Sequence, residues 1–154
     1  MQISVLLKLP RVFHSLCALK QAQVRLSDNG LKWLEEKMNL PDKGEIVDRP
    51  GRKTENLEYA ANWHEAIRLA ARLPLWKRQN IPACLPKALA LHKLLLAHGM
   101  PAVLCLGVSK RGRQLASHAW VELYDQMVGE PANVAEEFVK VNARAWPRQA
   151  VGKN

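Results

Sequence analysis

The sequence predicts an α+β fold in which helices come first and a small antiparallel sheet follows. Two observations predict this order. The first two thirds of the chain repeat apolar residues at intervals of three and four, which is typical of amphipathic helices. After residue 101 the pattern changes to a short apolar run and then to alternating apolar and polar residues, which is typical of strands. Helices followed by strands indicate an α+β domain.

The first 40 residues are expected to form two helices. Residues 9–26 repeat apolar side chains at helical spacing, and residues 27–40 begin with Ser27 and Asp28, which suit the start of a second helix. The apolar positions of the first helix are Val12, Leu16, Leu19, Val24 and Leu26. We therefore expect one helix to end, and the next to begin, near Ser27.

A loop and a third helix follow. Residues 41–53 contain two prolines and two glycines among charged residues, which is typical of a loop that divides two halves of a chain. Thr54 is the expected cap of the third helix, and Pro74 is expected to end it. One face of this helix carries Leu57, Ala60, Ala61, His64, Ile67 and Ala71.

The next expected helix begins with a cysteine. Its sequence is CLPKALALHKLLLAHG, residues 84–99. Pro86 suits the first turn of a helix, where its missing N–H costs nothing, and Gly99 is a common helix terminator. Cys84 is therefore expected at or beside the helix N-terminus. Free N–H groups and the helix dipole favour a thiolate there, which is the nucleophilic form of cysteine.

Strands are expected after this helix. Residues 102–108, AVLCLGV, predict a buried strand, and residues 116–124, ASHAWVELY, alternate between two faces. One face carries Ala116, His118, Trp120 and Glu122, and the other carries Ser117, Ala119, Val121 and Leu123. Residues 127–131 predict a brief third strand, and residues 133–141 fit either a helix or a strand.

Composition narrows the class of protein. The chain has 154 residues and a formal net charge of +9. No apolar run approaches the roughly 20 residues that span a bilayer, and the start lacks the form of a signal peptide, so we expect a cytoplasmic protein that binds no membrane. The charge is spread along the chain, which favours a solvated basic surface over nucleic-acid binding. We divide the chain into an N-terminal helical region (1–53), a core domain (54–145) and a flexible tail (146–154).

The three cysteines are Cys17, Cys84 and Cys105. Their number is odd, their spacing is wide and no C-x-x-C pair occurs, so the pattern fits neither a disulfide framework nor a zinc site. We expect the thiols to be reduced, and nothing in the sequence indicates a metal or an organic cofactor.

If Cys84 is a nucleophile, it needs a base. The histidines of its own helix lie two or more turns away, whereas His118 lies on a strand that could reach the helix start. A third group should orient the imidazole, and either Glu130 on the following strand or Asp125 in the turn could do so. The alternative is that Cys84 and His118 are packing residues and that the carboxylates are exposed.

A longer stretch, CLPKALALHKLLLAHGMPAVLCLGVSKRGRQLASHAWVEL, resembles the core of the lasso-peptide leader peptidases. These are a branch of the transglutaminase-like, papain-related cysteine proteases. The shared features are a Cys-Leu pair that opens an Ala- and Leu-rich helix, an aliphatic strand ending in GV, a basic turn and the motif HAWVE. The resemblance covers residues 76–131, and CL-x-x-ALAL together with HAWVE is its most specific part.

This resemblance implies a Cys–His–acid triad that cuts the leader from a ribosomally made precursor peptide. Cys84 would be the nucleophile and His118 the general base and acid. The family's acid position, counted without a gap, falls on Glu130. That position is Glu where the family often has Asp, and the turn YDQM lacks the family's glycine, so Asp125 remains the alternative.

Further roles follow from the same resemblance. Papain-like sites stabilise the oxyanion with a backbone N–H and an upstream side-chain amide, for which Gln79 and Asn80 are the candidates. Trp76 and Trp120 are candidates to line the substrate cleft. The implied partners are the precursor peptide, a separate leader-binding protein and a lasso cyclase.

Two other functions stay open from the sequence. A transglutaminase-like acyltransferase or amidase would use the same triad and the same thioester on another peptide. A non-catalytic basic adaptor, or a nucleic-acid-binding protein, would instead use the positive surface, and its binding to polyanions would weaken steeply with salt.

Overall fold

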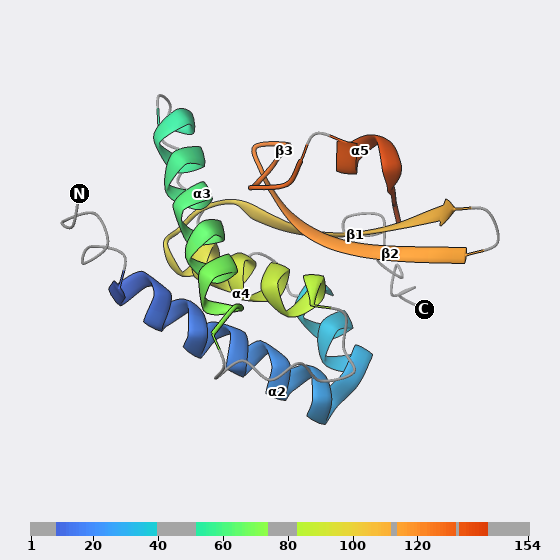
Figure 1. Ribbon diagram of the computed structural model, residues 1–154, viewed down its shortest axis with the longest axis horizontal. Helices are drawn as coiled ribbons and strands as arrows, with labels where there is room; N and C mark the ends of the chain where they lie inside the picture. Colours follow the sequence, from blue (N-terminus) through green and yellow to red (C-terminus); the bar gives the residue numbers. More distant parts are fainter. Residues whose placement is uncertain (1–8, 40–51, 74–82, 112–113, 132, 142–154) are drawn as a thin grey trace, which may run out of the picture.

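The computed structural model describes residues 9–39, 52–73, 83–111, 114–131 and 133–141 (Figure 1). Helices come first: α2 (Leu9–Asn39), α3 (Lys53–Ala70) and α4 (Cys84–Ala97). A long hairpin of β1 (Ala102–Arg111) and β2 (Gln114–Leu123) follows. The short elements β3 (Gln126–Met127), α5 (Asn133–Glu137) and β4 (Val139–Lys140) come last. This order confirms the predicted α+β fold.

The strands form one antiparallel sheet in the order β3-β2-β1-β4. In the β1–β2 register, Gly107 lies opposite His118 and Cys105 lies opposite Trp120. Because directly paired residues point to the same side of a sheet, these four residues share one face with Glu122. We call this face the polar face. The opposite face of β2 carries Ala119, Val121 and Leu123, so the alternation expected from the sequence is confirmed.

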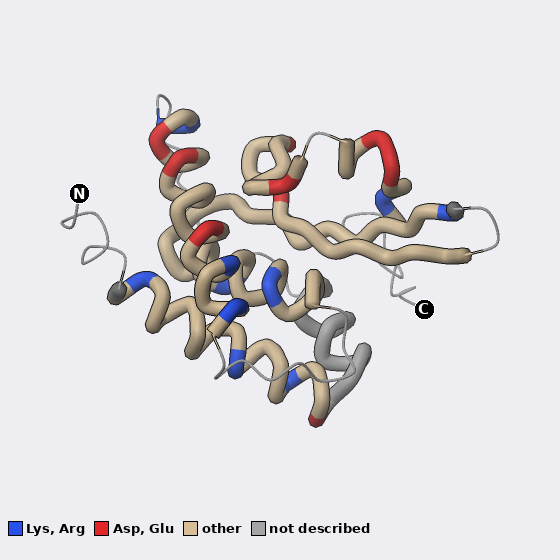
Figure 2. Tube along the Cα trace, in the orientation of Figure 1, with Lys and Arg blue, Asp and Glu red and all other residues tan. Residues whose placement is uncertain are grey.

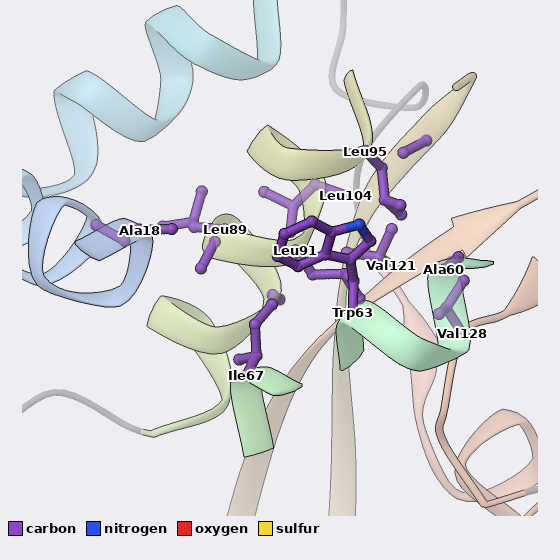
Figure 3. Close-up of a cluster of buried hydrophobic side chains, with 14 of the residues drawn as sticks. Ala18, Ala60, Trp63, Ile67, Leu89, Leu91, Leu95, Leu104, Val121 and Val128 are labelled. Carbon is purple, nitrogen blue, oxygen red and sulfur yellow. The ribbon is translucent and has the colours of Figure 1, made fainter. Parts of the chain in front are cut away.

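The two faces are covered by different elements. The layer of α2, α3 and α4 packs on one side of the hairpin, and α5 lies on the other side (Figure 1). Figure 3 shows α4 at the centre of the hydrophobic core, between the other helices and the sheet. The core side chains include Ala18 of α2, Trp63 and Ile67 of α3, Leu89, Leu91 and Leu95 of α4, and Leu104 and Val121 of the hairpin. The face of β2 that contacts this core is therefore the one that carries Val121.

Residues 9–39 form one helix, where we expected two within the first 40 residues. α2 runs from Leu9 to Asn39 without a break at Ser27 and Asp28. Ser27 Oγ donates a hydrogen bond to the Val24 carbonyl, 3.2 Å away, so the hydroxyl is satisfied inside the helix and caps nothing. Poor helix formers cost only a few tenths of a kcal/mol each, to about 1 for glycine, and tertiary packing of α2 on α3 and α4 outweighs this. Val24, expected on the apolar face, is exposed.

Three details of α3 and α4 also test the predictions made from the sequence. α3 starts at Lys53 with Arg52 as its cap residue, so the prediction that Thr54 caps it is wrong. Ala61 of the expected apolar face of α3 is exposed. The expected end of α4 is confirmed, because Gly99 has a φ of +71° and the Met100 N–H bonds back to the Leu95 carbonyl.

Residues 133–141, which fitted either type of element, form α5 followed by β4. The expected tail, the turn residues 112–113 and nearly all of the loop at 41–53 lie outside the described residues. Within the described part of the chain, no helix is long and apolar enough to cross a membrane.

Candidate active site

Cys84 is the first residue of α4. It is half-buried and packs against the hydrophobic core. The preceding cap residue, Ala83, has no side-chain hydrogen bond to the helix, and the first turn contains no acidic residue. The N–H groups of this turn are therefore not capped by a side chain. Their partial positive charge lies at the helix N-terminus, beside Cys84.

His118 and Glu130 form a hydrogen-bonded pair. Glu130 follows β3, and its Oε2 lies 3.2 Å from His118 Nε2. The two side chains are 23% and 19% exposed, so the pair is shielded from bulk water but open to one side. A carboxylate at this distance fixes the orientation of the ring.

Aromatic contacts hold the other sides of the His118 ring. Trp120 lies nearly parallel to it, with ring centroids 6.0 Å apart, and Phe138 lies at 5.3 Å. Gly107 makes room for Trp120, because a Cβ on that glycine would lie 2.7 Å from two atoms of the indole ring. The hairpin can hold the tryptophan over its own backbone only with glycine at this position.

Comparison with known proteins identifies the family. Residues 31–143 match the model of the transglutaminase-like superfamily, from within α2 to just beyond β4. The chain belongs to this superfamily. Its members are generally enzymes of the cysteine-protease type, and the matched region contains Cys84, His118 and Glu130. No curated protein and no solved structure gives a significant match.

A buried polar network supports the polar face of this transglutaminase-like domain. Trp120 Nε1 donates a hydrogen bond to Glu122 Oε1 (3.0 Å), and Lys140 Nζ donates to Glu122 Oε2 (2.6 Å). Burial alone would raise the pKa of Glu122, but the hydrogen bonds from Lys140 and Trp120 more than offset it, so the pKa lies below its usual value. The network fixes the indole that contacts His118.

Cys105 lies beside this network and differs from Cys84. It is completely buried, and burial together with the nearby Glu122 raises the pKa of its thiol to about 12. Cys105 is therefore protonated and unreactive at neutral pH. Of the two cysteines in the sheet–helix core, Cys84 is the one with access to solvent.

His64 of α3 is a part of this region that the sequence did not single out. Its ring lies against Gly129, so closely that a Cβ on the glycine would overlap ring atoms. Burial lowers the pKa of His64, the charge of Glu130 opposes this, and Lys87 in the first turn of α4 adds to it. His64 thus lies within electrostatic reach of both the Glu130 pair and the helix turn that begins with Cys84. In the sequence it was simply one of six residues on the apolar face of a helix.

The other expected site residues divide into two groups. Asp125, the alternative acid, lies in an exposed turn with a φ of +60°, and the carboxylate that accepts a hydrogen bond from His118 is that of Glu130. Trp76, Gln79 and Asn80 lie outside the described residues. Trp120 is 2% exposed and contacts His118 from within the fold.

The electrostatic surroundings of the site differ from those of the rest of the surface. Figure 2 shows Lys and Arg positions along α2 and α4, and Asp and Glu positions at the start of α3 and around β3 and α5. Among the described residues, the helical layer therefore carries an excess of positive charge, whereas the sheet with its connecting segments and α5 carries an excess of negative charge. Among the described residues, no group of three or more His, Cys, Asp or Glu could hold a metal ion.

Proposed function

We propose that this protein is a cysteine peptidase that removes the leader from a ribosomally synthesised, lasso-type precursor peptide. The observation that carries the proposal is the His118–Glu130 hydrogen bond, in a transglutaminase-like domain whose Cys84 opens a helix. In the described residues, Cys84 Sγ has no hydrogen bond to His118. The proposal therefore includes a contact between the Cys84 thiol and the His118 imidazole.

The chemistry assigns one task to each group. Glu130 accepts a hydrogen bond from Nε2 of His118, which leaves Nδ1 to take the proton from the thiol. The thiolate of Cys84 attacks the carbonyl carbon of the scissile peptide bond and forms a tetrahedral oxyanion. The C–N bond then breaks, the leaving amine takes the proton from His118, and a thioester remains. Water, deprotonated by His118, hydrolyses the thioester and restores the thiol.

The first test measures alkylation of Cys84 by iodoacetamide as a function of pH. Cys17 is exposed and would also react, so all proteins carry Cys17→Ser. Cys105 needs no replacement because it is buried and its pKa is raised to about 12. Modification is located by mass spectrometry of tryptic peptides.

The expected result is rapid alkylation at pH 7 that depends on the imidazole. An ordinary thiol is only a few per cent thiolate at this pH, so we expect His118→Ala to slow the reaction by about tenfold or more. Glu130→Gln should slow it less, because the ring remains. Equal rates in the parent protein and in His118→Ala would contradict the proposal and favour the adaptor function.

The leader substrate and the partners are the more specific part of the proposal. A separate leader-binding protein would deliver the precursor, and a lasso cyclase would use the amine that cleavage frees. Incubation with candidate precursor peptides, followed by mass spectrometry, should give a leader fragment with a free carboxylate. The Cys84→Ala protein should give none.

An acyltransferase is the second candidate, because the superfamily match fits water or an amine as acceptor equally well. Adding hydroxylamine to the same incubation separates the two functions. A peptidase should give mostly free carboxylate at low hydroxylamine concentration, whereas an acyltransferase should give hydroxamate in preference to the hydrolysed product.

A further inference from the structure

Glu130 lies in a segment with few backbone restraints of its own. The segment leaves the sheet after the Val128 N–H bonds to the Val121 carbonyl. The next described backbone hydrogen bond in this segment is from the Val134 N–H to the Pro131 carbonyl, at the start of α5. Among the described residues between these two bonds, side-chain contacts contribute to the position of the Glu130 carboxylate.

His64 supplies such a contact from a different element. It projects from α3, whose neighbours Trp63 and Ile67 are buried in the core, so its backbone is firmly placed. Its ring fills the space beside Gly129, the residue directly before Glu130. Gly129 has a φ of +72°, a conformation that favours glycine, and the absent Cβ is also what lets the imidazole approach.

We propose that His64 is a positioning residue: its ring, packed against Gly129, holds the segment so that the Glu130 carboxylate faces His118. This inference rests on the proposed function, because it assigns His64 a task in the same site. His64 would act through Glu130 and would not touch the substrate or the reacting atoms.

The charges around His64 agree with a packing contact by a neutral ring. Burial lowers its pKa, Lys87 of α4 and Arg68 of α3 lower it further, and Glu130 and Glu65 oppose them. A neutral His64 ring does not form an ion pair with the Glu130 carboxylate, so it does not compete with His118 for that carboxylate. The ring then acts on Glu130 through the shape of the segment.

The test measures the nitrogen chemical shifts of the His118 ring by NMR at one fixed pH in the full-length protein. All proteins carry Cys84→Ala, so that the result does not depend on whether the thiol reacts. Glu130→Gln removes the carboxylate that accepts the hydrogen bond from Nε2 and should change the chemical shift of Nε2. His64→Ala should change it in the same direction by at least half as much. The double variant should match Glu130→Gln alone, because His64 acts only through Glu130.

Two further variants keep the test valid if His64→Ala folds poorly. Gly129→Ala forces the ring and the segment apart and should give the same shift as His64→Ala. Gly99→Ala is the matched control, because it has the same positive φ (+71°) with no atom within 4 Å of the added Cβ. His92→Ala, at a half-buried histidine of α4, controls for loss of an imidazole. Both controls should leave the chemical shift of His118 Nε2 unchanged.

Each remaining outcome overturns the inference. An unchanged Nε2 chemical shift in His64→Ala and Gly129→Ala, with a changed one in Glu130→Gln, would mean that Glu130 is placed without His64. Additive changes in the double variant would mean that His64 acts on His118 by another route. An unchanged chemical shift in Glu130→Gln would mean that the His118–Glu130 hydrogen bond does not form. None of these readings depends on alkylation of Cys84, so a failure of the proposed function would be seen separately.

Discussion

One face of β2 packs on the helices through Ala119, Val121 and Leu123. The other face presents His118, Trp120 and Glu122 to β4, to Phe138 and to the segment after β3. The same ten residues of strand therefore support a dry core on one side and a hydrogen-bonded network on the other. The first face is specified by shape and burial. The second is specified by partners that arrive later in the chain, so its geometry depends on short elements at the C-terminal end.

The largest expected effect comes from the core face. Leu123→Ala removes a side chain that is 0% exposed, and should lower the free energy of unfolding by about 3 kcal/mol through lost burial and a residual cavity. Urea denaturation followed by circular dichroism measures the change. Leu115→Ala on the same strand is the control, because that side chain is 76% exposed and its loss should cost less than about 0.5 kcal/mol. Similar losses in both variants would mean that the core face is not packed as described.

The comparison between the faces also explains which features the sequence could predict. Alternation along residues 116–124 predicted both faces, because the period of a strand is fixed by its backbone. The helix from Cys84 to Gly99 was predicted because a proline near its start and a glycine near its end are strong local signals. In contrast, Ser27 looked like a cap, and packing of α2 on two other helices overrode it.

Contacts between distant segments were the part that local patterns could not predict. The partner of Glu122 is Lys140, from residues that fitted either a helix or a strand. The contact of His64 with Gly129 joins residues 65 positions apart, and neither residue has a local feature that predicts it. For the acid, the sequence left Glu130 and Asp125 open, and the choice depends on how the chain turns after β2, where Tyr124 and Asp125 both adopt positive φ.

A smaller effect is expected from the network on the polar face. Lys140→Ala removes the charged donor from the buried Glu122 carboxylate while the hydrogen bond from Trp120 Nε1 remains, and should cost about 1 kcal/mol at pH 7. The pKa of Glu122 is lowered in the folded protein, so its contribution is present above the usual value of 4.5 and is lost as the pH falls through the folded value. Loss of Lys140 raises that pKa.

The Lys140→Ala protein should therefore lose less stability on acidification than the parent protein, so that the difference between the two proteins narrows as the pH falls below 4.5. Denaturation midpoints measured between pH 3 and pH 7 would show this. Glu136→Ala changes the charge at an exposed position of α5 and is the control. It should leave the loss of stability at low pH almost unchanged. If the parent protein and Lys140→Ala lost the same stability on acidification, the ion pair would not stabilise the polar face.

The smallest expected effect lies where the two faces meet, at His64. Its pKa is lowered by burial below the usual value of 6.5, so the unfolded chain takes up this proton at a higher pH than the folded protein does. Above that value the residue contributes nothing to pH dependence. As the pH falls below it, the free energy of unfolding should decrease, by at most about 1.4 kcal/mol per pH unit, until the folded protein is protonated too.

Two charged neighbours of His64 should change this loss of stability at low pH in opposite directions. Glu130 raises its pKa, so Glu130→Gln should deepen the loss of stability and extend it to lower pH, whereas Lys87 lowers the pKa, so Lys87→Met should shorten the loss. His64→Ala should remove this component of the slope between pH 7 and pH 5. Urea titrations at half-unit pH steps measure all three slopes. If Glu130→Gln and Lys87→Met changed the slope in the same direction, His64 would not lie between a carboxylate on the polar-face side and an ammonium at the start of α4. Any electrostatic interaction between the His118–Glu130 pair and the helix that begins with Cys84 would then involve residues other than His64.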